Sequence, residues 1–201
     1  MSTPTTSTKR EPWAREKLIT TASELFYEEG VHTVGIDRVI QEAGVAKATL
    51  YKHFSSKDEL IRAYLLRHHE ITRDRMVREL GKRFTTPIDK MVGVFEVLGE
   101  SFSRPDFHGC AYVNASAEAR PGGPVEEASD YARAWVRGLF VDLGREAGLI
   151  DPLAIGQQLS LMYDGATVAA KMDRDPTMAI AAQRAARAVL EAAPRAAISP
   201  S

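Results

Sequence analysis

Apolar residues recur along this chain at helical spacing almost throughout. The segment 13–29 shows the pattern clearly, because one helical face collects Leu18, Ala22, Leu25 and Phe26. No run of β-branched residues alternates with polar ones between turns, as a strand would require. An all-α fold of about nine helices is predicted, at residues 13–29, 33–43, 47–53, 57–81, 87–103, 110–119, 124–147, 152–172 and 176–193.

Short local signals set the limits of the helices near the amino terminus. Gly30 is predicted to end the first helix and Gly44 the second, each as a left-handed cap. Thr33 is predicted to cap the start of the second helix. Ser56 and Glu59 match a capping box, in which each side chain satisfies a free backbone donor near the other residue, so a long helix is expected to begin there.

Residues 33–54 combine two short helices and a tight turn through Gly44, which is the sequence form of a helix-turn-helix. The second helix of that motif lies in the DNA major groove and meets base edges with its first residues. Leu50 and Phe54 are predicted to anchor the short helix to the core. The residues of suitable type to contact phosphates or bases are Lys47, Thr49, Tyr51, Lys52 and Lys57.

The segment ASELFYEEGVHTVGIDRVIQEAGVAKATLYKHFSSKDEL resembles the DNA-binding domain of the tetracycline-repressor-like (TetR) transcriptional regulators. The resemblance covers about residues 15–65. Ala46 departs from it where the family commonly has a serine cap, and Ala48 where a glycine is common. The expected DNA-binding residues are Thr33, Lys47, Ala48, Thr49, Tyr51, Lys52, His53 and Lys57.

The motif and the resemblance together predict two domains. Residues 12–58 would form the DNA-binding domain, and the fourth helix, about 57–81, would connect it to the second. The resemblance implies that residues 82–194 form a helical ligand-binding and dimerisation domain. The tails 1–11 and 195–201 are expected to be disordered.

Aromatic and polar residues in the second half could line a pocket for a small apolar or aromatic ligand. The alternative is that most of these side chains are plain core. The candidate ligand-binding residues are Phe95, Phe102, Phe107, Cys110, Asn114, Tyr131, Trp135 and Tyr163.

The last two predicted helices are candidates for a four-helix interface between two copies of the chain. The final one is rich in alanine, which permits close helix approach, although packing within one chain would use the same residues. The candidate dimerisation residues are Leu159, Met162, Ala166, Ala182, Ala185 and Val189. A two-fold dimer would match a palindromic operator with half-sites roughly 34–36 Å apart.

The composition is that of an ordinary globular protein, and its charge is modestly uneven along the chain. The net charge of −1 conceals an asymmetry, since residues 1–83 carry 15 Lys and Arg against 12 Asp and Glu, and the remainder carries 11 against 15. No apolar run is long enough to span a membrane, and the first residues lack the apolar centre of a signal peptide. A cytoplasmic location is therefore expected.

Cys110 is the single cysteine, so no disulfide can form within one chain. The segment 107–118 resembles a part of some TetR-family members that sense electrophiles or oxidants through a cysteine there. A thiolate would be stabilised by the start of a helix and by His108. A lone cysteine beside alanine and valine is otherwise a small buried apolar residue, and both interpretations stay open.

Motifs for other classes of protein are incomplete. HHEIT at 68–72 has Arg73 where a zinc-protease helix needs its second histidine, and GESFS at 99–103 has Ser103 where a nucleophile elbow needs glycine. His108 and Cys110 are too few to define a metal site. No enzyme activity, cofactor or metal is therefore expected. A helical adaptor without DNA affinity is the remaining rival, and it would lack the steep salt dependence of DNA binding.

The sequence therefore predicts a homodimeric regulator that binds double-stranded DNA and responds to a small-molecule inducer of unknown identity. A repressor is favoured over an activator. Ligand binding would change the separation of the two recognition helices and so release the palindromic operator.

Overall fold

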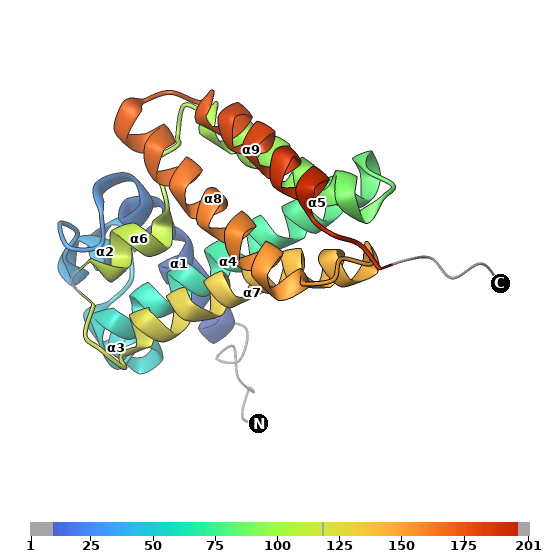
Figure 1. Ribbon diagram of the computed structural model, residues 1–201. Coiled ribbons are helices and arrows are strands. Elements are labelled where there is room, and N and C mark those ends of the chain that lie inside the picture. The colour runs from blue at the N-terminus through green and yellow to red at the C-terminus, as the bar shows by residue number, and fades with distance from the viewer. Residues whose placement is uncertain (1–9, 118, 197–201) are drawn as a thin grey trace. The chain divides into compact units, whose positions relative to one another are not determined.

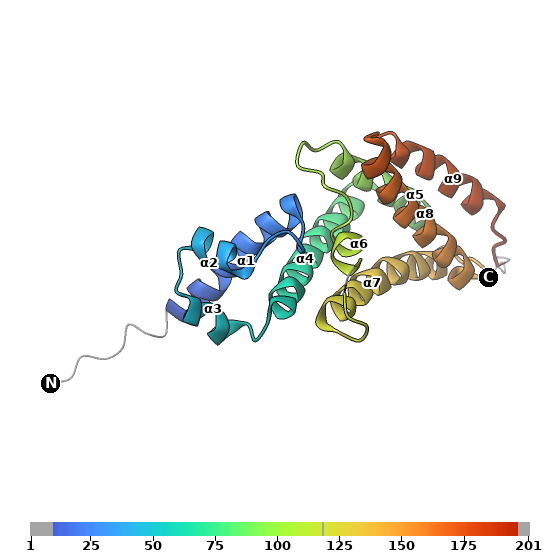
Figure 2. The ribbon, with the colours of Figure 1, turned by 90° about the vertical axis from the view of Figure 1, so that its left-hand side faces the viewer.

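The computed structural model describes residues 10–117 and 119–196. Within these residues it is helical except for turns, loops and one antiparallel bridge between Leu149 and Arg195. Figures 1 and 2 show the helices from two directions. They are α1 (Arg10–Glu29), α2 (Ile36–Ala43), α3 (Lys47–His53), α4 (Lys57–Arg83), α5 (Pro87–Phe102), α6 (Ala111–Ser116), α7 (Pro124–Glu146), α8 (Pro152–Asp173) and α9 (Met178–Ala192).

The all-α prediction is confirmed, and several predicted caps are present. Gly44 ends α2 in the left-handed region at φ +60°, where its backbone N–H donates to the carbonyls of Ile40 and Gln41. The Glu59 N–H donates to Ser56 Oγ at 3.2 Å, which is one half of the predicted capping box.

The predicted cap at Thr33 is wrong. Residues 31–34 form a turn before α2, and the N-cap of α2 is Gly35, in an extended conformation. The turn is held by the Val34 N–H, which donates to the Gly30 carbonyl at 3.2 Å. Val31 and Val34 are buried on either side of the exposed Thr33, so burial of these valines sets the chain path and delays the helix to Ile36.

The ends of the described chain differ from the predicted tails. Helix α1 already begins at Arg10, whereas residues 1–9 of the predicted disordered tail lie outside the described residues. At the other end, the Ala196 N–H donates to the Gly148 carbonyl at 2.9 Å, and Arg195 forms the bridge to Leu149. Residues 195–196 are thus tied by backbone pairing to Gly148 and Leu149, just after the end of α7, and residues 197–201 lie outside the described part.

The described chain divides into two compact units, and the first combines residues 10–70 with the described part of 111–130. Its core joins α1, α2 and α3 to the first half of α4, with Phe26 and Tyr64 packed edge to face at 5.9 Å between ring centroids. The side chains of Ala111 and Ala115 on α6 are buried in this same core.

This division differs from the predicted one, which placed residues 82–194 in a single domain. The structure groups α6 and the start of α7 with the DNA-binding segment. The reason is that the apolar face of α6 is small, an alanine pair four residues apart, and covers the core of the first unit.

The second unit comprises residues 71–110 and 131–196. Within it, α5, α8 and α9 pack against one another, and the carboxyl-terminal part of α7 adds Phe140 and Leu143 to the core. Phe95 and Phe140 stack at 5.9 Å between ring centroids, and both are fully buried. Burying a side chain of this size stabilises the fold by roughly 1.5–3 kcal/mol.

An ion-pair network fixes the end of α4 to α5 inside the second unit. Arg75 donates to Glu100 at 2.9 Å and to Ser101 Oγ at 2.8 Å, while Arg83 hydrogen-bonds to both Glu96 and Glu100. None of the helices in the described ranges is sufficiently long and apolar to cross a bilayer.

Candidate nucleic-acid interface

Helix α3 has one anchored side and one open side. Leu50 is fully buried, and Phe54 closes the helix by donating its N–H to the Leu50 carbonyl at 2.9 Å. Tyr51, the residue after Leu50, is 51% exposed. The apolar side chains therefore hold this seven-residue helix in place while its other side remains open to a partner.

All eight predicted DNA-binding residues belong to the first unit, and each has at least part of its surface accessible. Thr49, His53 and Lys57 are half-buried. The exposed ones are Thr33, Lys47, Ala48, Tyr51 and Lys52.

The amino-terminal end of α3 bears an ion pair that sequence reasoning missed. Lys47 Nζ lies 2.9 Å from the Asp37 carboxylate of α2. The hydrogen bond and the charge of Asp37 raise the pKa of Lys47. Ala46, the N-cap of α3, offers no side-chain acceptor, so the first turn is held only by the Ala46 carbonyl, which accepts from the Thr49 N–H at 2.9 Å.

Helix α1 adds cations beside the motif that were also missed. The Arg15 guanidinium lies 5.5 Å from the centroid of the Phe54 ring. Lys17 Nζ lies 5.1 Å from the Trp13 ring, and it is the nearest side-chain atom to a Cβ built on Gly44, at 3.7 Å. The spacing of Trp13 and Lys17, four residues apart at the start of a predicted helix, was the signal that could have revealed this pair.

Helix α2 is fixed to the end of α1 by a two-point ion pair. Arg38 donates to the Glu29 carboxylate at 2.5 and 2.8 Å. Such bidentate geometry restrains orientation as well as distance. It therefore helps to hold α2, and with it the turn into α3, at a defined angle to α1.

The predicted ligand-binding residues are only partly brought together. Phe95 and Phe102 are buried in the core of the second unit, where the ring of Phe102 lies 5.0 Å from that of Phe107. Cys110 and Trp135 are half-buried, and Tyr131 is 56% exposed.

Tyr163 and Asn114 differ from the other predicted ligand-binding residues, the first in its pKa and the second in the unit to which it belongs. Burial raises the pKa of the Tyr163 phenol, and the nearby Cys110 and Asp164 act in the same direction. Asn114 is exposed on α6 and belongs to the other unit, so the structure does not place it relative to Phe95. The predicted residues thus contribute mostly to core packing in the described structure.

The predicted dimerisation residues require a correction. Leu159 is fully buried and Ala166 is 7% exposed, because their side of α8 packs inside the chain's own core. Met162, Ala182 and Val189 are half-buried, and Ala185 is exposed. The large apolar residues that α8 and α9 leave exposed are Leu153, Leu161, Val168, Met172 and Ile180.

Comparison with known proteins supports a DNA-related role. Residues 18–64 match the family model described as bacterial regulatory proteins, tetR family. A crystal structure of SCO4454, a TetR-family transcriptional regulator from Streptomyces coelicolor, is 35% identical to this chain with a TM-score of 0.80. The match covers 89% of this chain and 94% of that one.

Two named regulators are also similar. The HTH-type transcriptional repressor NemR of Escherichia coli is 26% identical over 169 residues, which cover 80% of this chain and 85% of NemR. The HTH-type transcriptional activator FasR of Mycolicibacterium smegmatis is 50% identical over 54 residues, which cover 27% of this chain and 25% of FasR. The similarity to FasR is thus limited to about a quarter of each protein.

Proposed function

Because this chain belongs to the TetR family of DNA-binding transcriptional regulators, we propose that it is a repressor that binds a palindromic operator as a homodimer. A small apolar or aromatic ligand releases it from that operator. The observation that carries the proposal is the arrangement of α3, in which a fully buried Leu50 is followed by an exposed Tyr51 and Lys52.

The DNA contacts divide by chemistry. Lys52 and Lys57 neutralise phosphates, and the Tyr51 hydroxyl donates to a phosphate oxygen, which fixes the register of the protein on the duplex. Lys47, Ala48 and Thr49 occupy the first turn of α3, from which a recognition helix reads base edges. The further contacts proposed are Thr33, His53, Arg15 and Lys17, which contribute affinity at the edge of the same surface.

The accessible apolar side of α8 and α9 supports the dimer. Leu161 is 68% exposed and Met172 is 77% exposed, although both are large apolar side chains. Gly165 lies between them, and a Cβ added there would meet no atom within 4 Å. We assign this side of the two helices, in place of Leu159 and Ala166, to the interface with a second copy, because an isologous contact would bury it.

Ligand release follows from two states of the dimer that differ in the separation of their α3 helices. A ligand that favours the wrong spacing by about 1–3 kcal/mol would weaken operator binding roughly 5–150-fold. The half-buried Trp135 and Tyr163 of the second unit are the residues proposed to meet that ligand.

A selection experiment tests the proposal directly. The full chain is used to recover bound sequences from random duplex DNA, and a palindrome with half-sites about one helical turn apart is expected. The double variant Tyr51→Ala/Lys57→Ala should remain a folded dimer and lose operator binding. Selection of no sequence, or unchanged binding by the double variant, would contradict the proposed surface.

A thiol-sensing repressor is the second candidate. Cys110 is half-buried directly before α6, and among the similar structures is that of E. coli NemR, described as its reduced form. If Cys110 is the sensor, diamide or a quinone should release DNA from the native protein and leave Cys110→Ser bound. Equal release from both proteins would exclude this candidate.

A further inference from the structure

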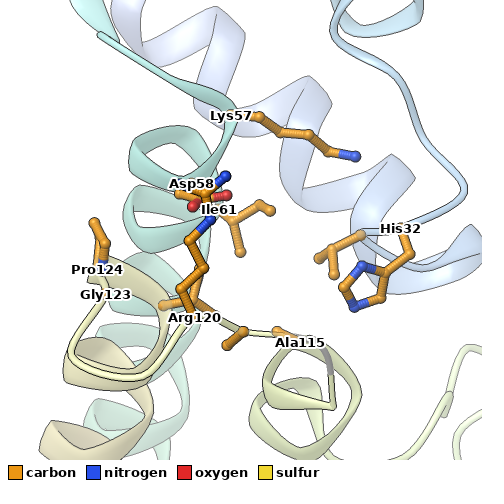
Figure 3. A pocket seen from close by; sticks show the side chains of 11 residues that line it. His32, Lys57, Asp58, Ile61, Ala115, Arg120, Gly123 and Pro124 are labelled. Carbon is orange, nitrogen blue, oxygen red and sulfur yellow. The ribbon is translucent and has the colours of Figure 1, made fainter.

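A small cavity lies entirely within the first unit, beside the predicted DNA-binding surface (Figure 3). It is partly open to solvent and has a volume of about 120 Å³, which is the share of about four water molecules in the liquid. This is much smaller than a pocket for a drug-sized ligand, which measures about 300–1,000 Å³. A ligand would therefore have only a few non-hydrogen atoms.

Six of the eleven residues that line the cavity are apolar, and the other five are glycine or ionisable. They come from the turn before α2, the first turns of α4, α6, residues 119–123 and the start of α7. The apolar lining residues are Val31, Ile61, Ala115, Ala119, Pro124 and Val125. Such a lining suits a short hydrocarbon chain, because its removal from water is favourable.

Four ionisable side chains also line the cavity, and their formal charges do not sum to zero. Figure 3 shows Arg120 extending toward Asp58 on one side of the cavity, with His32 on the other side and Lys57 crossing above. With the histidine counted as neutral, these groups carry a net charge of +1. An anion of a single charge would balance this set, whereas a phosphate dianion would exceed it and meet the Asp58 carboxylate as well.

Lys57 is in a setting that favours an added anion. Partial burial lowers the pKa of its ammonium group, and the charge of Asp58 only partly opposes this effect. An anion beside the ammonium would restore part of the stabilisation that water provides to a fully exposed lysine.

We propose that this cavity binds a short-chain monocarboxylate, with the alkyl chain against the apolar walls and the carboxylate between Lys57 and Arg120. Because Lys57 is also a proposed phosphate contact, the bound carboxylate competes with the DNA backbone for the same cation. This second step rests on the proposed function. The carboxylate site itself does not.

Direct binding is tested with sodium butyrate and the full chain. Amide resonances of Val31, Ile61 and Gly123 are followed by NMR at constant ionic strength, and saturable shifts are expected. Butyramide, which has nearly the same shape without the charge, should produce no saturable shift. Equal responses to butyrate and butyramide, or no saturation by butyrate, would overturn the proposal.

Variants of the lining residues test whether butyrate binds in this cavity or is attracted only by the overall charge of the protein. Arg120→Gln should weaken butyrate binding about tenfold, as expected for loss of one charge-assisted hydrogen bond. Ala119→Leu fills the cavity without changing its charge and should abolish binding. Lys52→Gln removes an exposed cation outside the cavity and should leave butyrate affinity unchanged. Unchanged binding by the Ala119→Leu protein, with its fold verified by circular dichroism, would exclude this cavity.

The coupling to DNA is measured on the selected duplex with butyrate replacing chloride at equal ionic strength. A decrease in duplex affinity of about fivefold or more is expected for the native protein, and none for Ala119→Leu. Butyrate binding without a change in duplex affinity would refute the competition and leave the carboxylate site standing. Failure to bind any duplex would refute the proposed function, while the NMR titration would still decide the site.

Discussion

Asp37 of α2 holds Lys47 of α3 in an ion pair of 2.9 Å, although both side chains are largely exposed to solvent. The two residues lie on the two helices of the helix-turn-helix, on either side of the turn at Gly44. The pair therefore places a negative charge next to the cation at the start of the proposed recognition helix.

This relationship predicts that Asp37 restrains DNA affinity. Asp37→Asn should increase affinity for the selected duplex by about twofold to fivefold, since exposed ion pairs contribute little and Lys47 would be fully available to DNA. Electrophoretic mobility shift at several salt concentrations measures the change. Glu42→Gln removes the same charge from α2 without touching this pair, and an equal increase for Glu42→Gln would show that only net charge matters.

The accessible side of α8 predicts how the dimer can be broken. Leu161→Asp with Met172→Asp should give a folded monomer, because burying two carboxylates in an apolar interface costs more than the contact gains. Sedimentation velocity measures the mass, and circular dichroism verifies the fold. Ile71→Asp alters another exposed large apolar residue, on α4, and should leave the dimer intact. A dimeric double variant would refute the assigned interface.

Close contact between α7 and α8 predicts that Gly156→Ala and Gly81→Ala change the free energy of unfolding in opposite directions. A Cβ on Gly156 would lie 2.5 Å from Val141 Cγ2 and 3.2 Å from the Val141 backbone nitrogen. Gly156→Ala should therefore lower the free energy of unfolding by about 1–3 kcal/mol.

The helical and exposed Gly81 has no such neighbour, so Gly81→Ala should raise the free energy of unfolding by up to about 1 kcal/mol. Chemical denaturation measures both variants against the native protein. Equal effects of the two substitutions would mean that the helices can separate at Gly156 without cost.

The half-buried His68 predicts that stability falls on mild acidification. Burial, with a smaller contribution from the charge of His69, lowers the pKa of His68 to about 4. The rings of Tyr27, Tyr64 and Tyr112 surround its imidazole. The unfolded chain, with an ordinary pKa near 6.5, takes up this proton first as pH falls.

The free energy of unfolding is therefore unaffected by protonation of His68 above about pH 6.5. It falls progressively toward pH 4, by about 3 kcal/mol in total. Denaturation between these pH values should show a smaller slope for His68→Phe than for the native protein. His32→Gln removes an exposed histidine of the same unit and is measured alongside as the control. An unchanged slope for His68→Phe would mean that other groups govern the acid sensitivity.

Features that depend on neighbours along the chain could be predicted from the sequence. The helix-turn-helix was predicted with α3 at its observed limits, Lys47–His53, since Gly44 and the apolar pair Leu50 and Phe54 act over only a few residues. Thr33 shows the limit of this approach. Its side chain suits a cap, but burial of Val31 and Val34 determines where α2 begins.

Features that depend on which face of a helix is buried could not be predicted from the sequence. Helix α8 has apolar residues on two sides, so its periodicity alone could not distinguish the buried Leu159 from the exposed Leu161. The cavity beside Lys57 gave no sequence signal either, because its lining comes from segments distant in the chain.

The sequence by itself therefore determined the helical fold, the DNA-binding motif and its family, because hydrogen bonds and caps within a helix link residues only three or four positions apart. The tertiary structure determined which residue pairs with Lys47, which face of α8 is buried and to which unit α6 belongs. Each of these depends on which surfaces exclude water together, and that is settled by packing between distant segments of the chain.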